Sequence, residues 1–411
     1  MITIYDDAKL IISNAIESAK PDAAVKRALE KMETGSGRLV LVATGKAAWQ
    51  MAAAAAQALG DRLDCGVVVT KYEHVKGPIP KVECYEAGHP VPDENSFRGT
   101  AKAIEVVTGL TEDDTVLFLI SGGGSALFEK PLVSPEELTS ITKQLLASGA
   151  EITEMNTVRK RISAVKGGKF AQLCKPAKVF SVVLSDIIGD PLDMIASGPA
   201  YPDSSTCQQA KDIIAKYNIQ ISPETEKLLD IETPKVLDNV TTEITGSVKQ
   251  LCVSAEATAK ELGYETVFLT DELCCQAREA GSFLGTIARS NYNTEKSVAY
   301  ICGGETVVKL IGKGLGGRNQ ELALSAAIHI DGLENVAVFS VGSDGTDGPT
   351  DAAGGYVDGG TAKALRAAGM DAEEILSRND AYNGLKECGG LIMTGPTGTN
   401  VNDLSVVLIK K

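Results

Sequence analysis

The chain has 411 residues, of which 44% are hydrophobic and 23% charged, proportions typical of a globular protein with two or three domains. Its formal net charge of −14 argues against nucleic acid as the main partner, because phosphate backbones bind basic surfaces. Apolar stretches are interrupted well before the roughly 18 residues of a membrane span, and the start of the chain lacks the pattern of a signal peptide. We therefore expect a cytoplasmic protein that binds neither membranes nor nucleic acid.

Nine cysteines, an odd number, are mostly isolated along the chain, and none has the C-x-x-C spacing of a zinc site. Without an export signal, they are expected to be reduced thiols of the cytosol. Three histidines are too few for a histidine-based metal centre.

Apolar strand patterns alternate with helical patterns from the start of the chain. Helical periodicity at residues 4–32 precedes an apolar strand at 38–43 and an Ala-rich helix at 46–59. Two further apolar strands are predicted at 114–120 and 177–187. Continuous apolar strands that alternate with helices are typical of a parallel sheet with both faces covered, so we expect an α/β fold.

The stretch 218–239 is more polar and less patterned, and we interpret it as the crossover between two domains, 1–236 and 237–411. After it the helical and strand patterns return. Residues 297–312 are predicted to form a bent strand or a hairpin, and residues 318–330 a helix. The chain closes with two predicted strands around a turn-rich loop.

The motif LISGGGSALFEKP places three glycines at the carboxyl end of the strand 114–120 and in front of a helix. Glycines can turn their backbone N–H groups inward, and a helix N-terminus adds positive partial charge, so this loop suits a phosphate or carboxylate group. The residues expected to bind that group are Ser121, Gly122, Gly123, Gly124 and Ser125. The alternative is a tight turn in which glycine serves only for packing.

Three more polar, glycine-rich loops follow predicted strands, at 303–308, 314–321 and 394–403, and they add Asn319 and Asn400 as candidate ligand-binding residues. Ligands of parallel sheets bind outside the carboxyl ends of the strands, where these loops are expected to lie. Neither G-x-x-x-x-G-K-[ST] nor G-x-G-x-x-G after a first strand is present, which argues against the common nucleotide- and dinucleotide-binding enzymes.

Four cations near these loops are candidates for binding an anionic substrate, namely Lys46, Arg159, Lys166 and Arg318. Lys46 stands at the start of a predicted helix, where a cation opposes the helix dipole, so a functional role is favoured over a solvated surface lysine. The planar guanidinium of Arg318 can bind a carboxylate or phosphate through two hydrogen bonds, and an ion pair with Glu321 is the alternative. For Arg159 and Lys166 the alternative is a solvated helix face.

Acidic residues at predicted strand ends suit Mg²⁺, which takes one or two carboxylates together with substrate phosphates. Asp186 and Asp190 follow one strand, Asp344 follows a later one, and Glu305 lies in a glycine-rich loop. We expect Asp186 to act as the base, and Asp190, Glu305 and Asp344 to bind the metal, although the sequence does not decide which acid has which role. For the neighbouring aspartates of the Asp344 loop, Asx turns and helix capping are the alternative.

The chain resembles the class II glycerate 2-kinase family, whose C-terminal part is the MOFRL domain. The resemblance is carried, in the family's order, by ATGKAAWQMA, GHPVPDENS, LISGGGSALFEKP, VRKRISAVKGGKFA, GGRNQELAL, SDGTDGPTDAAGG and TGPTGTNVNDL. It runs through nearly the whole chain. It implies a Rossmann-like α/β/α N-terminal domain with a parallel sheet, a smaller α/β C-terminal domain, and an active site in the cleft between them.

The resemblance also implies ATP-dependent phosphorylation of D-glycerate on its 2-hydroxyl, with Mg²⁺ or another divalent cation, to give 2-phosphoglycerate and ADP. The lysine and the arginine suggested for the family's active site fall on Lys46 and Arg318. The alternatives are an NAD(P)H-dependent hydroxypyruvate reductase, for which a dinucleotide fingerprint is missing, and a non-catalytic sugar-acid-binding protein. The sequence leaves open the metal preference, the 2- or 3-phosphate product, and whether the chain forms a homo-oligomer.

Overall fold

A computed structural model describes residues 3–185, 189 and 192–411, so Asp186 and Asp190 lie outside the described residues. The chain divides into two compact units. The N-terminal unit contains Ala24–Ser185 together with residues 192–245, and the C-terminal unit contains residues 3–23 and 246–411. No helix in these ranges is long and apolar enough to cross a membrane.

This division differs from the predicted domains 1–236 and 237–411 at both ends. Helix α1 (Ile4–Ala19) packs on α11 (Val248–Glu261) within the C-terminal unit, although it starts the chain. Strand β6 (Val240–Gly246) joins the sheet of the N-terminal unit. Each predicted domain is one continuous range of residues. The compact units are defined by which elements pack together, so the start of the chain belongs to the C-terminal unit.

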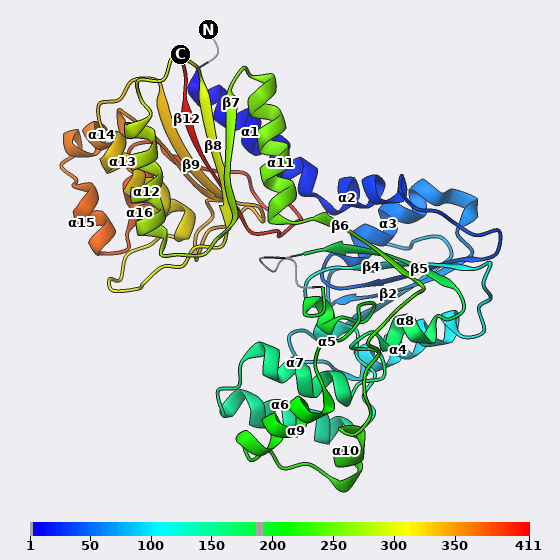
Figure 1. Cartoon of the computed structure of the whole chain (residues 1–411). Coiled ribbons are helices and arrows are strands. Elements are labelled where there is room, and N and C mark those ends of the chain that lie inside the picture. The colour runs from blue at the N-terminus through cyan, green and yellow to red at the C-terminus, as the bar shows by residue number, and fades with distance from the viewer. Residues whose placement is uncertain (1–2, 186–188, 190–191) are drawn as a thin grey trace. The chain divides into compact units, whose positions relative to one another are not determined.

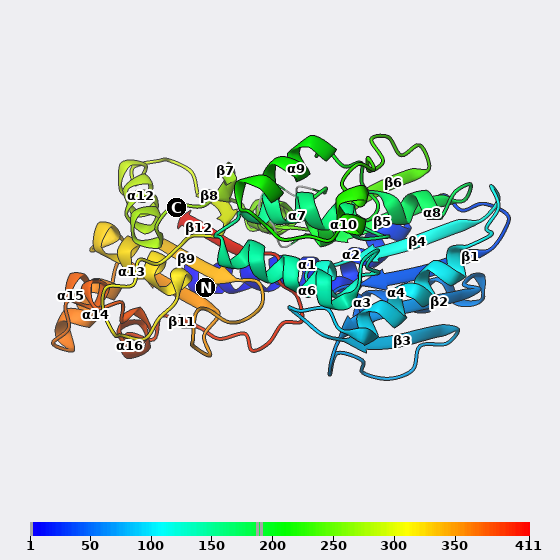
Figure 2. The same ribbon diagram turned by 90° about the horizontal axis from the view of Figure 1, so that it is seen from below.

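The N-terminal unit is built on a six-stranded sheet with the order β3-β2-β1-β4-β5-β6 (Figure 1). The strands before β6 are β1 (Leu39–Thr44), β2 (Cys65–Lys71), β3 (Val82–Ala87), β4 (Thr115–Ile120) and β5 (Lys178–Leu184). The pairings among β1 to β5 are parallel, as predicted, and Figure 2 shows β3, β2, β1 and β4 side by side. The strand order reverses between β1 and β4, which is where such sheets bind their ligands.

The helices of this unit surround the sheet and extend beyond one end of it. They are α2 (Pro21–Leu29), α3 (Ala48–Leu59), α4 (Glu94–Val107), α5 (Gly124–Leu127), α6 (Pro135–Ala147), α7 (Ile152–Arg161), α8 (Lys169–Leu173), α9 (Cys207–Lys216) and α10 (Pro223–Leu228). Helices α6, α7 and α9 share a small core that includes Leu138, Ile141, Val158 and Ile213. The predicted helix at 46–59 starts two residues later than expected, which leaves Lys46 in the loop before it.

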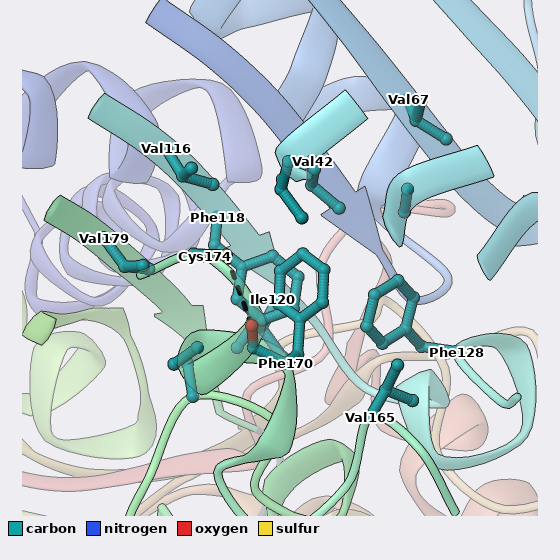
Figure 3. Close-up of a cluster of buried hydrophobic side chains, with 14 of the residues drawn as sticks. Val42, Val67, Val116, Phe118, Ile120, Phe128, Val165, Phe170, Cys174 and Val179 are labelled. Carbon is teal, nitrogen blue, oxygen red and sulfur yellow. Dashed lines mark hydrogen bonds between the residues drawn. The ribbon is translucent and has the colours of Figure 1, made fainter. Parts of the chain in front are cut away.

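A buried aromatic cluster fixes the chain that follows β4. Every residue of β1 and β4 is buried, as their unbroken apolar sequences require. The ring of Phe118 in β4 packs against Phe128 and Phe170, with ring centroids 5.5 and 4.7 Å away (Figure 3). Because Phe128 directly follows the short helix α5, this packing anchors the far end of the glycine loop.

The C-terminal unit has a mixed sheet with the order β11-β10-β9-β12-β8-β7. Its strands are β7 (Glu265–Leu273), β8 (Val298–Gly304), β9 (Val336–Gly342), β10 (Gly354–Asp358), β11 (Leu391–Ile392) and β12 (Asp403–Ile409). Strand β12 is antiparallel to both β8 and β9, so its first residue, Asp403, pairs with their last residues, Gly304 and Gly342. The loops after β8 and β9 therefore lie next to the start of β12, at the same end of these three neighbouring strands.

Helices cover both faces of this second sheet. Besides α1 and α11 they are α12 (Ala277–Ser290), α13 (Arg318–Ile330), α14 (Thr361–Ala367), α15 (Ala372–Ser377) and α16 (Ala381–Glu387). In Figure 1, α1 and α11 lie on one side of the sheet, and α12 and α13 on the other. The predicted helix at 318–330 is confirmed. Within the stretch 297–312, only Val298–Gly304 form a strand, β8, and residues 305–312 form no second strand, so the hairpin alternative is wrong.

Candidate active site

The loops after β1 and β4 interlock at the point where the strand order of the N-terminal sheet reverses. The backbone N–H of Lys46 donates to the carbonyl of Gly122 (2.9 Å). The N–H of Ala47 donates to Ser121 Oγ (3.1 Å), and that hydroxyl in turn donates to the carbonyl of Thr44 (3.3 Å). The predicted ligand-binding hydroxyl of Ser121 is therefore engaged in holding the two loops together.

Two backbone N–H groups of the glycine loop remain available to a ligand. In the part of the chain that the structure describes, the amides of Gly122 and Gly123 donate to no protein atom, and both residues are partly exposed. Gly123 has φ 87°, a left-handed conformation that glycine adopts without strain, and it caps the N-terminus of α5. Adjacent free amides in such a turn can bind an anion, and the anion-binding role of this loop stays a prediction.

Lys46 and His89 lie beside these amides. A Cβ placed on Gly123 would stand 3.2 Å from Lys46 Cγ and 3.0 Å from His89 Cδ2, so both side chains lie close to this glycine. Lys46 is exposed, and within the described ranges its ammonium has neither an ion pair nor a hydrogen bond. Burial, followed by the charge of Lys46, lowers the pKa of His89, which favours its neutral form. Lys46 thus places one unpaired positive charge beside the free amides of Gly122 and Gly123, and His89 next to it is neutral.

His89 is a site residue that the sequence analysis missed. It follows β3, and the loop after β3 lies at the same carboxyl edge of the parallel sheet as the loops after β1 and β4. Its position directly after a parallel strand was the sequence feature that could have indicated a role in the site. Apart from that position, a histidine in a proline-rich loop resembles a structural residue. His74 contacts the Lys46 carbonyl through Nδ1 (2.8 Å) and supports the same loop.

Arg159 and Lys166 were predicted to bind the substrate, but their side chains hold the end of the glycine loop. Arg159 Nη2 and Lys166 Nζ both donate to the carbonyl of Ser125, at 2.9 and 2.8 Å. Lys166 also donates to the carbonyl of Phe128 (2.9 Å), and it lies 3.3 Å from the carboxylate of Glu129. Because Lys166 and Glu129 are both fully buried, Lys166 is a supporting residue in this structure.

Ser125 is likewise held by its neighbours. Its hydroxyl lies 2.9 Å from Ser197 Oγ, which donates to Asn156 Oδ1 (3.0 Å). Ala196 and Ser197 both have positive φ values, 51° and 62°, which are unfavourable for residues other than glycine. A Cβ on Gly124 would stand 2.6 Å from Ala196 Cβ, so this strained turn packs directly against the glycine loop. Such strain is concentrated at functional sites.

In the C-terminal unit, Arg318 is the first residue of α13, and it binds the first residue of β12. Arg318 Nε lies 2.5 Å from Asp403 Oδ2, and Nη2 lies 3.0 Å from Oδ1. Glu305, which directly follows β8, lies 3.3 Å from Nη1. The predicted alternative pairing with Glu321 is not formed, because the Glu321 carboxylate accepts from Asn379 Nδ2 (3.0 Å).

The N-terminus of α13 is already occupied by a protein carboxylate. Asp347 accepts hydrogen bonds from the backbone N–H groups of Asn319 (3.2 Å) and Gln320 (2.9 Å). Burial raises the pKa of Asp347 to about 6. The side-chain amide of Asn319 is also buried. Its Nδ2 donates to Asp347 Oδ1, and its Oδ1 accepts from the hydroxyl of Ser340. Asn319 therefore organises the loop, whereas the other predicted residue, Asn400, is exposed.

The predicted metal ligands do not come together among the described residues. Asp344 Oδ1 accepts from the N–H and the hydroxyl of Thr346, at 2.9 and 3.1 Å, which is an Asx turn. Glu305 faces Arg318. In residues 3–185, 189 and 192–411 no group of three or more His, Cys, Asp or Glu side chains is placed to hold a metal ion. The described carboxylates thus do not by themselves form a metal site.

A pocket of about 600 Å³ opens beside Arg318 within the C-terminal unit. Its polar side includes Glu305, Thr306 and Arg318, and its apolar side includes Val307 and Leu310. Ligand pockets of this size commonly combine an apolar wall with a few polar groups.

Family models match both parts of the chain. One described as "Domain of unknown function (DUF4147)" matches residues 7–230, and one described as the MOFRL family matches residues 298–403. The chain is 54% identical to a Thermotoga maritima protein named D-glycerate 2-kinase, over 97% of both sequences. It is 40% identical to an Agrobacterium vitis protein named putative hydroxypyruvate reductase, over 97% of this chain and 93% of that one.

The fold is also that of a solved structure. A crystal structure of a glycerate kinase from Thermotoga maritima superimposes with a TM-score of 0.93 at 54% sequence identity. The match covers 98% of each chain. The similarity therefore extends over both compact units.

Proposed function

Because the chain belongs to the class II glycerate 2-kinase family, we propose that it transfers the γ-phosphoryl group of ATP to the 2-hydroxyl of D-glycerate. The products are 2-phosphoglycerate and ADP. The observation that carries this proposal in the structure is the unpaired ammonium of Lys46 beside the free amides of Gly122 and Gly123. Together they form a site for an anionic group at the edge of the sheet where ligands bind.

Phosphoryl transfer depends mainly on positioning and on neutralising negative charge, with little covalent chemistry for the protein to perform. Lys46 supplies a positive charge, and the amides of Gly122 and Gly123 supply fixed donors for phosphate oxygens. Arg318 supplies a second cation, which is oriented by Asp403. We assign Lys46 and Arg318 to the phosphate groups and the glycerate carboxylate.

Asp186 remains our proposed base for the 2-hydroxyl, and Asp190 a proposed ligand for Mg²⁺, although both lie outside the described residues. A divalent cation, when bound, would neutralise charge on the phosphates of ATP. We expect the reaction to take place in the cytoplasm, where ATP is available and where the nine unpaired cysteines stay reduced.

The reductase activity named for one relative is the competing assignment. It requires NAD(P)H, whereas the loop after β1, Gly45 to Ala48, contains one glycine where the dinucleotide motif needs three. The Lys46 ammonium also stands in that loop and is suited to phosphate oxygens. The kinase assignment accounts for both features.

The test is a direct assay of phosphoryl transfer. The purified chain is incubated with D-glycerate, ATP and Mg²⁺, and the products are resolved by ³¹P NMR. We expect a 2-phosphoglycerate signal that disappears when the divalent cation is chelated. Oxidation of NAD(P)H by hydroxypyruvate without a phosphorylated product would overturn the proposal in favour of a reductase. Binding of glycerate without either reaction would indicate a non-catalytic protein.

A further inference from the structure

The guanidinium of Arg318 is held from one side by a buried carboxylate. Asp403 accepts from Nε and from Nη2, and its side chain is only 6% exposed. Charge-assisted pairs with two parallel hydrogen bonds are both strong and geometrically restrictive. The plane and the direction of the Arg318 side chain are therefore set by Asp403.

Both partners of this pair stand on rigid backbone. Asp403 begins β12 and is paired on one side with Gly304 of β8 and on the other with Gly342 of β9. Arg318 begins α13, whose first turn is bound to Asp347. A Cβ on the preceding residue, Gly317, would stand 2.2 Å from Asp347 Cγ, so that backbone is closely packed as well.

The pairing leaves a defined set of donors unused by Asp403. A guanidinium has five N–H groups, and the contact with Asp403 takes the one on Nε and one of the two on Nη2. The remaining N–H groups are one on Nη2 and two on Nη1. The Nη1–Nη2 end of the guanidinium can therefore still bind two oxygens of one carboxylate or phosphate group.

Glu305 lies beside Nη1, the guanidinium nitrogen that bears none of the hydrogen bonds to Asp403. Its Oε1 lies 3.3 Å from Nη1, the side chain is 48% exposed, and no hydrogen bond between the two groups meets normal geometry. Exposed ion pairs of this kind stabilise a protein little, so an incoming anion can displace the Glu305 carboxylate easily. The two acids therefore bind Arg318 differently. Asp403 is buried and accepts two hydrogen bonds from Arg318, whereas Glu305 is half exposed and accepts none.

We infer that Asp403 is a positioning residue that directs the Nη1–Nη2 end of Arg318 toward an anionic group of the substrate, and that Glu305 occupies that anion's place until it is displaced. The inference rests on the proposed function. The anion is a carboxylate or a phosphate group, supplied either by glycerate or by the nucleotide. Removing the two acids has opposite consequences: losing Asp403 disturbs the direction of Arg318, and losing Glu305 removes a competitor.

The experiment compares D403N, E305Q and the control D331N in the full chain. Asp331 forms an exposed pair with Arg366 in the same unit (2.8 Å), so D331N removes a similar carboxylate away from the site. Affinities for D-glycerate alone and for ADP alone are measured by calorimetry, and kcat and KM by the ³¹P assay. The ligand whose affinity responds to E305Q identifies the source of the anion.

For E305Q we expect the dissociation constant of one of the two ligands to fall about two- to fivefold, the range of an exposed ion pair. For D403N we expect kcat to fall about 10- to 100-fold, while affinity for that ligand changes no more than about threefold, because the charge of Arg318 is retained and only its direction is lost. D331N should match the wild type. A D403N enzyme with kcat within twofold of wild type, or weaker binding of both ligands by E305Q, would overturn the inference.

A double-mutant comparison with Arg318 distinguishes a positioning role of Asp403 from a general loss of structure in D403N. We expect R318K and R318K/D403N to have the same kcat, because a lysine cannot form the two-point pair and Asp403 then has nothing to orient. Additive losses in the double variant would overturn the positioning role. If D403N does not fold, the E305Q titration still decides the part played by Glu305. If even the wild type lacks kinase activity, the proposed function fails, whereas the ligand titrations still test the anion site.

Discussion

Gly45 and Ser121 lie so close together that no side chain fits between them. A Cβ on Gly45 would stand 2.2 Å from Ser121 Oγ and 2.4 Å from its carbonyl oxygen. Gly45 also has φ 115°, a conformation that residues with a Cβ rarely adopt. This approach brings the loop that carries Lys46 against the loop that carries Gly122 and Gly123, so the candidate site depends on it.

The substitution G45A should destabilise the chain by about 2–4 kcal/mol, because it adds both a clash with backbone and an unfavourable φ. Gly60 offers a matched control, since it also has positive φ (57°) but no atom within 4 Å of an added Cβ. We expect G60A to cost about 1–2 kcal/mol, from its backbone conformation alone. Urea denaturation measures the unfolding free energy of both variants. Equal losses in G45A and G60A would show that the close approach to Ser121 adds nothing to the cost.

The substitution K46A should lower kcat/KM about 10²- to 10³-fold, the range seen when one charge-stabilising group is lost. The melting temperature should change by no more than about 2 °C, because Lys46 is exposed and its ammonium has no partner among the described residues. Steady-state kinetics and a thermal melt check the two expectations. Near-normal activity in K46A would remove this residue from the mechanism.

The substitution K166M should destabilise the chain by about 3–5 kcal/mol, because it leaves the buried Glu129 carboxylate with only the more distant Arg159 (3.9 Å) as a cation. The double variant K166M/E129L removes this poorly compensated charge, and we expect it to recover at least half of the loss. The exposed pair of Lys260 and Glu256 (2.8 Å) provides the control K260M, which should be nearly neutral. The midpoints of urea denaturation distinguish these outcomes. A double variant no more stable than K166M would mean that Lys166 acts mainly through the carbonyls of Ser125 and Phe128.

Asp347 should make stability depend on pH in a predictable direction. Burial raises its pKa from 3.8 to about 6 in the folded chain, so the folded state binds the proton more tightly than the unfolded state does. The stabilisation is complete below about pH 4 and is lost as the pH rises through 6, by on the order of 3 kcal/mol. Melts of wild type and D347N between pH 4 and 7 should therefore converge or cross as the pH rises. A constant difference across this range would contradict the raised pKa.

Much of the architecture could be predicted because it depends on short stretches of sequence. The helix 318–330 has its predicted bounds, and the apolar strands at 38–43 and 114–120 lie within one residue of β1 and β4. The glycines at 122–124 could be placed at a strand end because a continuous apolar run precedes them. Hydrophobic periodicity and glycine conformation are local properties, so the sequence alone determined these elements and identified Lys46 as a cation beside an anion-binding loop.

Only the tertiary structure decided which polar groups are free and which are already bound. Lys166 looks like a substrate-binding cation in the sequence, yet it is buried on the carbonyls of Ser125 and Phe128. Conversely, His89 and Asp403 enter the candidate sites because parallel and antiparallel pairings bring distant segments to one edge of a sheet. Hydrogen bonds and ion pairs form between side chains that are close in space, and that proximity is set by the packing of the whole chain.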